Sequence, residues 1–440
     1  MRKILHLVML LCLWLPHLAS GQRSNDKRFP FMAWDYVEDP RILQSMHEAG
    51  ITSVAFVRPK TLNDCQKYNL KCIVFDERLS GDLWSKPFNG DLFRKNLSSI
   101  IKEVGNHPAL WGYHVKDEPP ESDFPELAKA VAGVNELAPG KWPYINLFPG
   151  EGDSYDKYLD HFVDIVHPAA LSYDRYSIIG EPGSGGLDPI FWENLAQVRD
   201  AAQRHHLPFW NIVLSSPHWR YRDLTEADIR LQVWASLAYG VRGISYYKFV
   251  SKELPILNAD DLGNWRGGPL NQFEEKTPTW DWLRDTDRQV QNIAPVYLQL
   301  RTDDVYHLGD IPKLNHGPSE QSLIKSMPEG EYVVGEFTHP TGDRYVLIVN
   351  KSLKRSAHCD PKFNVPPAEV QYVFPRTGET KPFPTRWYWL APGQGVLLRL
   401  VAKNSAGKTS ILTIFGAEFR QVPLGFANYE ISTHESRLPF

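Results

Sequence analysis

Short apolar runs alternate with amphipathic stretches along this chain, and the alternation repeats eight times between residues 29 and 300. Apolar runs of a few residues are typical of buried strands, whereas apolar residues spaced three and four apart are typical of helices with one buried face. The runs predict strands at 31–36, 51–57, 71–75, 109–115, 143–148, 170–173, 208–214 and 243–249, each followed by a helix. Eight such units favour a (β/α)8 barrel, the TIM barrel, over residues 29–300.

An open, doubly wound sheet is the alternative arrangement of alternating strands and helices. That fold commonly has fewer units and a glycine-rich turn after its first strand. Trp34 and Asp35 stand at that place here, so the pattern favours the closed barrel.

Capping residues mark where two of the predicted helices begin. Asp123 offers an acceptor for the helix after the fourth strand, with Glu126 three residues on as the reciprocal acid. Thr225 and Asp228 have the same relation before the seventh helix, which is expected to end at Gly240.

The pattern changes after residue 300, where apolar and polar residues alternate with a period of two between turn residues. Such alternation is typical of antiparallel strands. Segments 332–337 and 345–350 predict a hairpin, and further strands are expected at 370–374 and 389–400. We therefore predict a C-terminal β-sandwich at 301–402, followed by a C-terminal extension at 403–440 that has no clear period.

The N-terminal segment has the features of a secretory signal peptide. Arg2 and Lys3 precede an apolar stretch at 4–18, and small residues at 19–21 provide a cleavage site. We expect a signal peptide at 1–21, a linker at 22–28, and a secreted or periplasmic mature protein.

Charge and hydropathy exclude two classes of partner. Loss of Arg2 and Lys3 with the signal peptide changes the formal net charge from −4 to −6, so the basic footprint expected for nucleic acid is missing. No later apolar run is long enough for an integral membrane segment.

Two adjacent carboxylates, Asp117 and Glu118, end the fourth predicted strand. The prolines at 119 and 120 cannot donate ladder hydrogen bonds, so the strand stops at this pair. Catalytic groups of parallel barrels lie at the carboxyl ends of strands, and Asp174 follows strand six. Acids crowded together have raised pKa values, and one can stay protonated near neutral pH. Glycoside hydrolysis needs a protonated carboxyl at the leaving oxygen and a second group at the anomeric carbon.

Other polar and aromatic residues near the strand ends form the predicted substrate-binding set. A period of two places His114 and Lys116 on the side of strand four that Glu118 occupies. An ordinary structural role is also open, such as salt bridges for Asp35 and Asp76. The complete set is Trp34, Asp35, Asp76, His114, Lys116, Asn146, Tyr173, Tyr176, Asn211, Trp219, Tyr246, Tyr247 and Lys248.

One stretch resembles the fourth-strand acid/base segment of clan A barrel glycoside hydrolases, including the family 42 β-galactosidase-like proteins: His107-Pro-Ala-Leu-Trp-Gly-Tyr113 with Asp-Glu-Pro at 117–119. The resemblance extends through 144–147, 172–176 and 240–247, and so through most of the barrel. A β-sandwich after the barrel is common among these enzymes. The resemblance implies that Glu118 is the general acid/base and that the partner is an oligosaccharide or polysaccharide substrate. It implies no cofactor.

One departure from that family concerns the nucleophile. Clan A enzymes place a nucleophilic glutamate at the end of strand seven, but residues 209–218 contain no acid here. One explanation is assistance by the substrate, as in hexosaminidases with an adjacent Asp–Glu pair. Asp117 would then polarise a 2-acetamido group, Glu118 would protonate the leaving group, and Tyr173 or Tyr247 would hydrogen-bond the intermediate.

Two further explanations take the carboxylate from another element. Asp174 is a candidate base or nucleophile from strand six, and its distance from Glu118 would separate retaining from inverting geometry. Glu226, at the start of helix seven, is a weaker candidate because a capping acid there is expected to face solvent. Substrate assistance and Asp174 stand level on the sequence alone.

Two other classes of function fit parts of the same pattern. His114, Asp117, Glu118, Asp174 and His218 are residue types that bind divalent ions, as in metal-dependent aldolases and isomerases, but no His-x-His spacing supports a metal site. A barrel that lost its nucleophile would instead be a catalytically inactive carbohydrate-binding protein. The acid pair behind a signal sequence favours a glycosidase that acts on an extracellular or periplasmic glycan.

Overall fold

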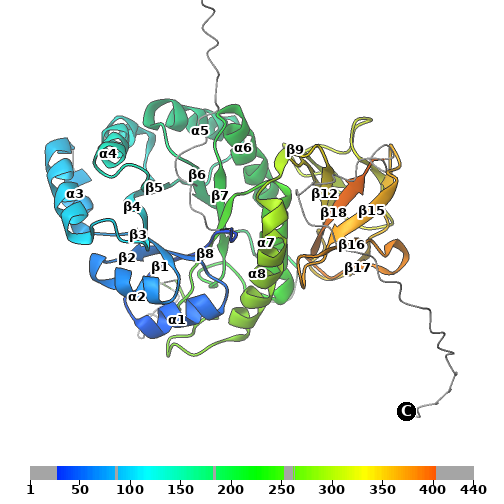
Figure 1. Ribbon diagram of the computed structural model, residues 1–440, viewed down its shortest axis with the longest axis horizontal. Helices are drawn as coiled ribbons and strands as arrows, with labels where there is room; N and C mark the ends of the chain where they lie inside the picture. The colour runs from blue at the N-terminus through cyan, green and yellow to red at the C-terminus, as the bar shows by residue number, and fades with distance from the viewer. Residues whose placement is uncertain (1–26, 85–87, 182–184, 252–260, 262, 403–440) are drawn as a thin grey trace, which may run out of the picture. The chain divides into compact units, whose positions relative to one another are not determined.

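The computed structural model describes residues 27–84, 88–181, 185–251, 261 and 263–402 (Figure 1). The predicted signal peptide at 1–21, most of the predicted linker at 22–28 and the extension at 403–440 lie outside the described residues. Among the helices that are described, none combines the length and the apolar character that a bilayer crossing requires.

Eight parallel strands form the barrel, and their order around it follows the chain. β1 pairs with β8, and a bridge between Leu147 and Tyr173 joins the ends of β5 and β6, so the ring closes. The predicted (β/α)8 barrel is confirmed, and the open-sheet alternative is wrong. The strands are β1 (Phe31–Tyr36), β2 (Ser53–Val57), β3 (Lys71–Val74), β4 (Leu110–Asp117), β5 (Trp142–Asn146), β6 (Leu171–Asp174), β7 (Phe209–Leu214) and β8 (Gly243–Tyr247).

Helices surround the strands, as Figure 1 shows, and bury their apolar faces against the outward-pointing residues of the barrel wall. Outward residues such as Val54 and Tyr113 share one core with helix residues such as Leu97 and Leu127. The helices are α1 (Pro40–Glu48), α2 (Leu62–Lys67), α3 (Gly90–Val104), α4 (Phe124–Leu137), α5 (Gly152–Val166), α6 (Ile190–Arg204), α7 (Glu226–Ala238) and α8 (Pro278–Tyr297).

The two predicted helix starts have different outcomes. The capping box before α7 is confirmed, because the Asp228 carboxylate accepts from the Thr225 N–H at 2.7 Å and the Thr225 hydroxyl accepts from the Asp228 N–H. The helix start at Asp123 is confirmed, because α4 begins at the next residue, but the predicted side-chain cap is wrong. The Asp123 side chain makes no cap hydrogen bond, and its carboxylate instead pairs with Lys116 Nζ at 2.8 Å.

The amino half of the barrel interior is filled by aromatic side chains. The rings of Trp111, Trp142 and Trp210, from β4, β5 and β7, pack with centroids 5.2–5.5 Å apart. Met32 and Tyr144 belong to the same inner cluster. A barrel interior is a packed core rather than a channel. Because the indoles fill its amino half, polar groups can gather only at the carboxyl end.

Antiparallel strands follow the barrel. The predicted hairpin is confirmed, since Tyr332 pairs with Asn350 and Thr338 with Arg344. The six-stranded sheet contains β9 (Arg301–Leu308), β11 (Tyr332–Thr338), β12 (Arg344–Asn350), β15 (Glu369–Val373), β16 (Thr380–Pro382) and β18 (Gly395–Val401). Two small sheets pair β10 (Ile324–Ser326) with β14 (Lys362–Phe363), and β13 (Ala357–His358) with β17 (Trp389–Leu390). Between the sheets lies an apolar core separate from that of the barrel, as in a β-sandwich.

Candidate active site

Three carboxyl groups meet at the ends of β4 and β6, around the amide of Asn146 at the end of β5. Asn146 Nδ2 donates to Asp117 Oδ1 at 3.2 Å and to Asp174 Oδ1 at 2.9 Å. Because one nitrogen reaches both oxygens, these oxygens are at most about 6 Å apart. Glu118 is a neighbour of Asp174, whose charge is, after burial, the largest cause of the raised pKa of Glu118. The Ser172 hydroxyl donates to Asn146 Oδ1 at 3.2 Å and so fixes the orientation of the amide.

An irregularity in β4 turns Asp117 towards the interior. The pairing of β4 with β5 slips by one residue between His114 and Lys116. The His114 ring lies inside the barrel, 4.9 Å from the ring of Phe56. The extra residue reverses the alternation beyond it, so Lys116 leaves the interior and Asp117 enters it. The prediction that Lys116 lies beside Glu118 is therefore wrong.

The backbone at Glu118 has a conformation that non-glycine residues seldom adopt, with φ at +42°. Its N–H donates to the Asn146 carbonyl at 2.8 Å, which continues the contact with β5 past the last strand pair. The chain then turns away through Pro119, which leaves the Glu118 side chain next to Asp174. Backbone strain of this kind is found most often at functional sites.

The acids of this cluster hold protons more tightly than ordinary carboxyls. Loss of water contact around its carboxyl, and secondly the charge of Asp174, raise the pKa of Asp117 to about 7, although the residue as a whole is exposed. The same loss of water contact, with both aspartates as neighbours, raises the pKa of Glu118. Asp174 is 8% exposed, and burial raises its pKa even though Asn146 donates a hydrogen bond to it.

Aromatic rings form the wall beside the acids. Tyr176 stacks on Tyr247 with ring centroids 5.1 Å apart. The His218 ring lies 5.5 Å from each of these two rings and stacks on Trp265 at 4.2 Å. The apolar faces and polar edges of such rings suit the apolar faces and hydroxyl edges of a sugar.

The two predicted indoles lie at different depths. Trp34 packs edge-on against Tyr247 at 5.3 Å, and its Nε1 donates to the Tyr144 hydroxyl at 3.2 Å, so this ring is part of the interior wall. Trp219 is 67% exposed and lies beside His218 at a ring distance of 6.2 Å. Trp219 therefore offers an open ring surface next to the aromatic wall.

Three predicted site residues do not reach this end of the barrel interior, because strand alternation turns them towards the helices. Tyr173 is fully buried in the core between the wall and the helices. Asn211 donates to the Ser236 hydroxyl of α7 at 2.9 Å. The Tyr246 hydroxyl donates to Asp287 of α8 at 2.5 Å. The prediction that these three side chains lie at the rim is therefore wrong.

Four further predicted residues have ion-pair partners within the protein. Asp35, within β1, pairs with Lys248, after β8, at 3.2 Å and also accepts from the Val250 N–H at 2.9 Å. Asp76 accepts two hydrogen bonds from Arg78, at 2.7 and 2.8 Å. Lys116 pairs with Asp123, as described above. These contacts fit the structural role that the sequence left open for Asp35 and Asp76.

His114 is buried beneath the acids, and burial lowers its pKa to about 4. Its Nε2 has no hydrogen-bond partner in the part of the chain that the structure describes. The neutral ring therefore adds no positive charge that would lower the pKa values of the acids above it.

Sequence reasoning missed two aromatic residues of this region. Tyr36, at the end of β1, is 60% exposed and stacks on Phe56 at 4.7 Å; loss of water contact at its hydroxyl, and secondly the charge of Asp117, raise its pKa. Trp265 lies beyond β8 and packs on His218. Alternation from Trp34 would have pointed to Tyr36, whereas Trp265 is in a loop with no periodic signal.

Two alternatives from the sequence can be compared with the structure. Glu226 pairs with Arg230 one helical turn on, and Arg230 also donates to the Pro392 carbonyl of the sandwich, so Glu226 lies outside the acid cluster. Within the described residues, no group of three or more His, Cys, Asp or Glu side chains is arranged to hold a metal ion.

Comparison with known proteins identifies the fold and no family. No protein-family model matches the sequence, and no curated protein matches it. A solved structure named only as a glycoside hydrolase superposes with a TM-score of 0.53, at 11% identity, over 85% of this chain and 92% of its own.

Two other solved structures give lower scores. The endo-β-1,4-mannanase of Thermotoga petrophila has a TM-score of 0.44 at 10% identity, over 75% of this chain and 96% of its own. A family 5 glycoside hydrolase variant of Bifidobacterium longum, in complex with Manβ1-4GlcNAc, has a TM-score of 0.47 at 10% identity, over 59% and 78%. The structural neighbours are thus glycoside hydrolases with a barrel, and at these identities the similarity shows the fold alone.

Proposed function

We propose that this chain is a glycoside hydrolase in which Glu118 is the general acid/base. The observation that carries the proposal is the cluster of Asp117, Glu118 and Asp174 around Asn146, at the carboxyl end of the barrel, with raised carboxyl pKa values. Chemistry on this fold is performed at that end. The signal-like N-terminal segment supports an extracellular or periplasmic glycan as the substrate.

In the mechanism that we favour, Asp174 is the nucleophile. Glu118 gives its proton to the glycosidic oxygen while an Asp174 oxygen attacks the anomeric carbon, so the bond to the leaving sugar breaks as a glycosyl ester forms. The Glu118 carboxylate then takes a proton from a water molecule that attacks the ester. This second step releases the sugar and restores both acids.

The spacing of the acids supports retention of configuration. Retaining enzymes hold their two carboxyls about 5–5.5 Å apart, whereas inverting enzymes leave about 6.5–9.5 Å for a water molecule. After burial, the charge of Asp174 is the largest cause of the raised pKa of Glu118, and this close approach of the two carboxyls favours the shorter, retaining spacing.

A second mechanism is supported by the different exposure of the two aspartates. Asp174 is only 8% exposed, whereas Asp117 has an exposed surface. In a substrate-assisted reaction, Asp117 would orient a 2-acetamido group and Tyr247 would hydrogen-bond the intermediate. Tyr173, which was the other candidate for that hydrogen bond, lies outside the barrel wall.

A panel of aryl glycosides, with and without 2-acetamido groups, tests the proposal. Wild type should release the aryl group from at least one member, and Asp174→Asn should lose more activity than Asp117→Asn. Cleavage restricted to N-acetyl sugars, with the larger loss in Asp117→Asn, would support substrate assistance instead. Turnover unchanged by a chelator is expected for either mechanism.

Binding without cleavage is the outcome that would contradict an enzyme. In that case wild type and Glu118→Gln would bind the same oligosaccharide with equal affinity, and neither would cleave it. The chain would then be a carbohydrate-binding barrel.

A further inference from the structure

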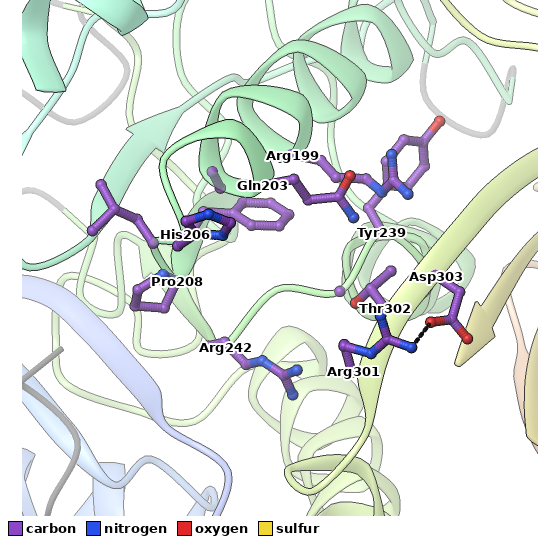
Figure 2. Close-up of a pocket in the computed structure, with 13 residues that line it drawn as sticks. Arg199, Gln203, His206, Pro208, Tyr239, Arg242, Arg301, Thr302 and Asp303 are labelled. Atoms are coloured by element: carbon purple, nitrogen blue, oxygen red, sulfur yellow. Dashed lines mark ion pairs between the residues drawn. The ribbon is translucent and has the colours of Figure 1, made fainter. Parts of the chain in front are cut away.

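A second concave site lies at the amino end of the barrel strands. A cavity of about 640 Å³ is bounded by the C-terminal part of α6, the start of β7, the turn between α7 and β8, and the start of β9 (Figure 2). Cavities of this size accommodate small organic ligands. Since the carboxyl cluster lies at the opposite end of the strands, the proposed hydrolysis does not use this cavity.

Three arginines from different elements line the cavity. Arg199 comes from α6, Arg242 from the turn before β8, and Arg301 from β9. Arg242 donates to the carbonyl of Tyr297 at 3.3 Å and to that of Leu300, which fixes its side chain. Figure 2 shows Arg242 and Arg301 on one side of the open space, with Arg199 and Gln203 across from them.

Acidic residues neutralise these arginines only in part. Asp303 is the one acid in the lining; it pairs with Arg301 at 2.9 Å, and it also contacts Arg344 at 3.4 Å and accepts from the Thr338 hydroxyl. Arg199 pairs with Asp200 at 2.9 Å. The lining therefore has an excess of positive charge.

Arg199 has a guanidinium whose donors are only partly paired. It is 8% exposed; its Nη1 pairs with Asp200, and its Nε, which is shielded from solvent, has no hydrogen-bond partner among the described residues. A guanidinium carries five N–H donors, and a buried donor without an acceptor is costly. Oxyanions satisfy guanidinium groups in the strongest geometry, because two parallel hydrogen bonds form.

We propose that this cavity binds a small organic anion with a carboxylate, sulfate or phosphate head and an apolar body. The head lies between Arg199 and the pair Arg242 and Arg301. The apolar body packs against Leu207 and Phe209, which line the same space.

Calorimetric titration of the full chain with phenyl phosphate, benzoate, inorganic phosphate and uncharged benzyl alcohol tests this site. Phenyl phosphate and benzoate should bind, and benzyl alcohol should not. Affinity should fall about tenfold or more as salt rises from low ionic strength, because the attraction is between charges.

Matched variants locate the binding. Arg199→Gln and Arg301→Gln should each weaken phenyl phosphate binding about tenfold, since each removes a charge-assisted contact. Arg204→Gln is the control, because Arg204 is on the same helix, pairs with Asp160 at 2.9 Å and does not line the cavity. Should Arg199→Gln fail to fold, Arg301→Gln decides, since that side chain is 77% exposed.

Three outcomes would overturn the proposal. They are no binding of either aryl anion at millimolar concentration, an equal loss in the Arg204→Gln control, and unchanged affinity in both cavity variants. Inorganic phosphate that binds as tightly as phenyl phosphate would overturn the role of the apolar wall. Because every readout is binding, failure of the proposed hydrolysis leaves this test unaffected.

Discussion

Two sets of acids in the same barrel have opposite surroundings. Asp228, in the first turn of α7, is fully buried and receives hydrogen bonds from Arg222 at 2.6 and 2.7 Å. Asp117 and Asp174, at the carboxyl end, share the neutral amide of Asn146 and have raised pKa values. A carboxylate with its own guanidinium is a structural element, whereas crowded acids keep a proton available for chemistry. The difference separates residues expected to control stability from residues expected to control turnover.

The largest expected effect is on catalysis. Glu118→Gln should lower kcat on a cleavable aryl glycoside by about 10²–10⁴-fold, because an amide cannot donate and recover the proton. Thermal unfolding should occur at the same temperature as in wild type or higher. Glu77→Gln is the control, since Glu77 is an exposed acid after β3 that pairs with Arg58 at 2.8 Å. Equal kcat in wild type and Glu118→Gln would remove the acid/base assignment.

Asp228 should show the opposite behaviour, with a large effect on stability and none on turnover. Asp228→Asn should reduce the free energy of unfolding by about 3–5 kcal/mol, because it leaves the buried Arg222 guanidinium without its counter-charge. Urea unfolding measures this loss, and kcat per folded molecule should not change. Glu226→Gln, in the same turn but half-exposed, should cost little. A large loss of kcat in folded Asp228→Asn would show that Asp228 also affects the acid cluster of Asp117, Glu118 and Asp174.

The pH dependence of stability sharpens the same contrast. The pKa of Asp117 is raised to about 7 in the folded protein, so the folded state holds a proton that the unfolded state releases near pH 4. Its contribution to stability is therefore complete below about pH 4 and is lost as pH rises towards 7. Asp117→Asn should be more stable than wild type at pH 8 and similar at pH 4.

Thermal melts of wild type and variant across this range check the prediction. The difference between the two curves is the relevant quantity, because His114, whose pKa is lowered to about 4, opposes the trend in both proteins. A constant difference from pH 4 to 8 would contradict the raised pKa of Asp117.

Tyr246 and Tyr247 are adjacent on β8 but face opposite sides of the barrel wall, so their substitutions should have different effects. Tyr246→Phe should lower stability by about 1–3 kcal/mol, since it leaves the buried Asp287 carboxyl without its donor, and should leave KM unchanged. Tyr247→Phe should change KM or kcat with little loss of stability. Chemical unfolding and steady-state kinetics on both variants give the comparison, and the reverse result would place Tyr246 inside the site.

The smallest expected effect is at the exposed indole. Trp219→Ala should raise KM for an oligosaccharide about fivefold, equivalent to about 1 kcal/mol of ring contact, with the melting temperature unchanged. Trp389→Ala on the sandwich, where the indole is 62% exposed, serves as the matched control. A rise in KM of the same size in the control would show that neither ring is part of a specific subsite.

The fold could be predicted from the sequence because it depends on local periodicity. Each predicted barrel strand corresponds to an observed strand, with ends that differ by at most a few residues. The positions of Asp117, Glu118 and Asp174 at strand ends followed from the same pattern. Parallel strands in a closed ring bring all carboxyl ends to one side, so proximity of these acids was also predictable.

The direction in which individual side chains point was harder to predict from the sequence. Tyr173, Asn211 and Tyr246 are adjacent in sequence to residues that face the interior, and strand alternation therefore turns them outwards. Consistent use of the period of two would have excluded them. The Arg-lined cavity had no sequence signal, because its residues come from three separate segments.

By itself the sequence determined the closed barrel, the antiparallel region after it, and an acid pair at the end of β4, because each is encoded by neighbouring residues. Only the tertiary structure decided that β4 slips by one residue against β5, which moves Lys116 out and Asp117 in. It also decided that Asp35 pairs with Lys248 across more than two hundred residues of chain. Strand registers and long-range ion pairs depend on how the ring closes, and no local pattern carries that information.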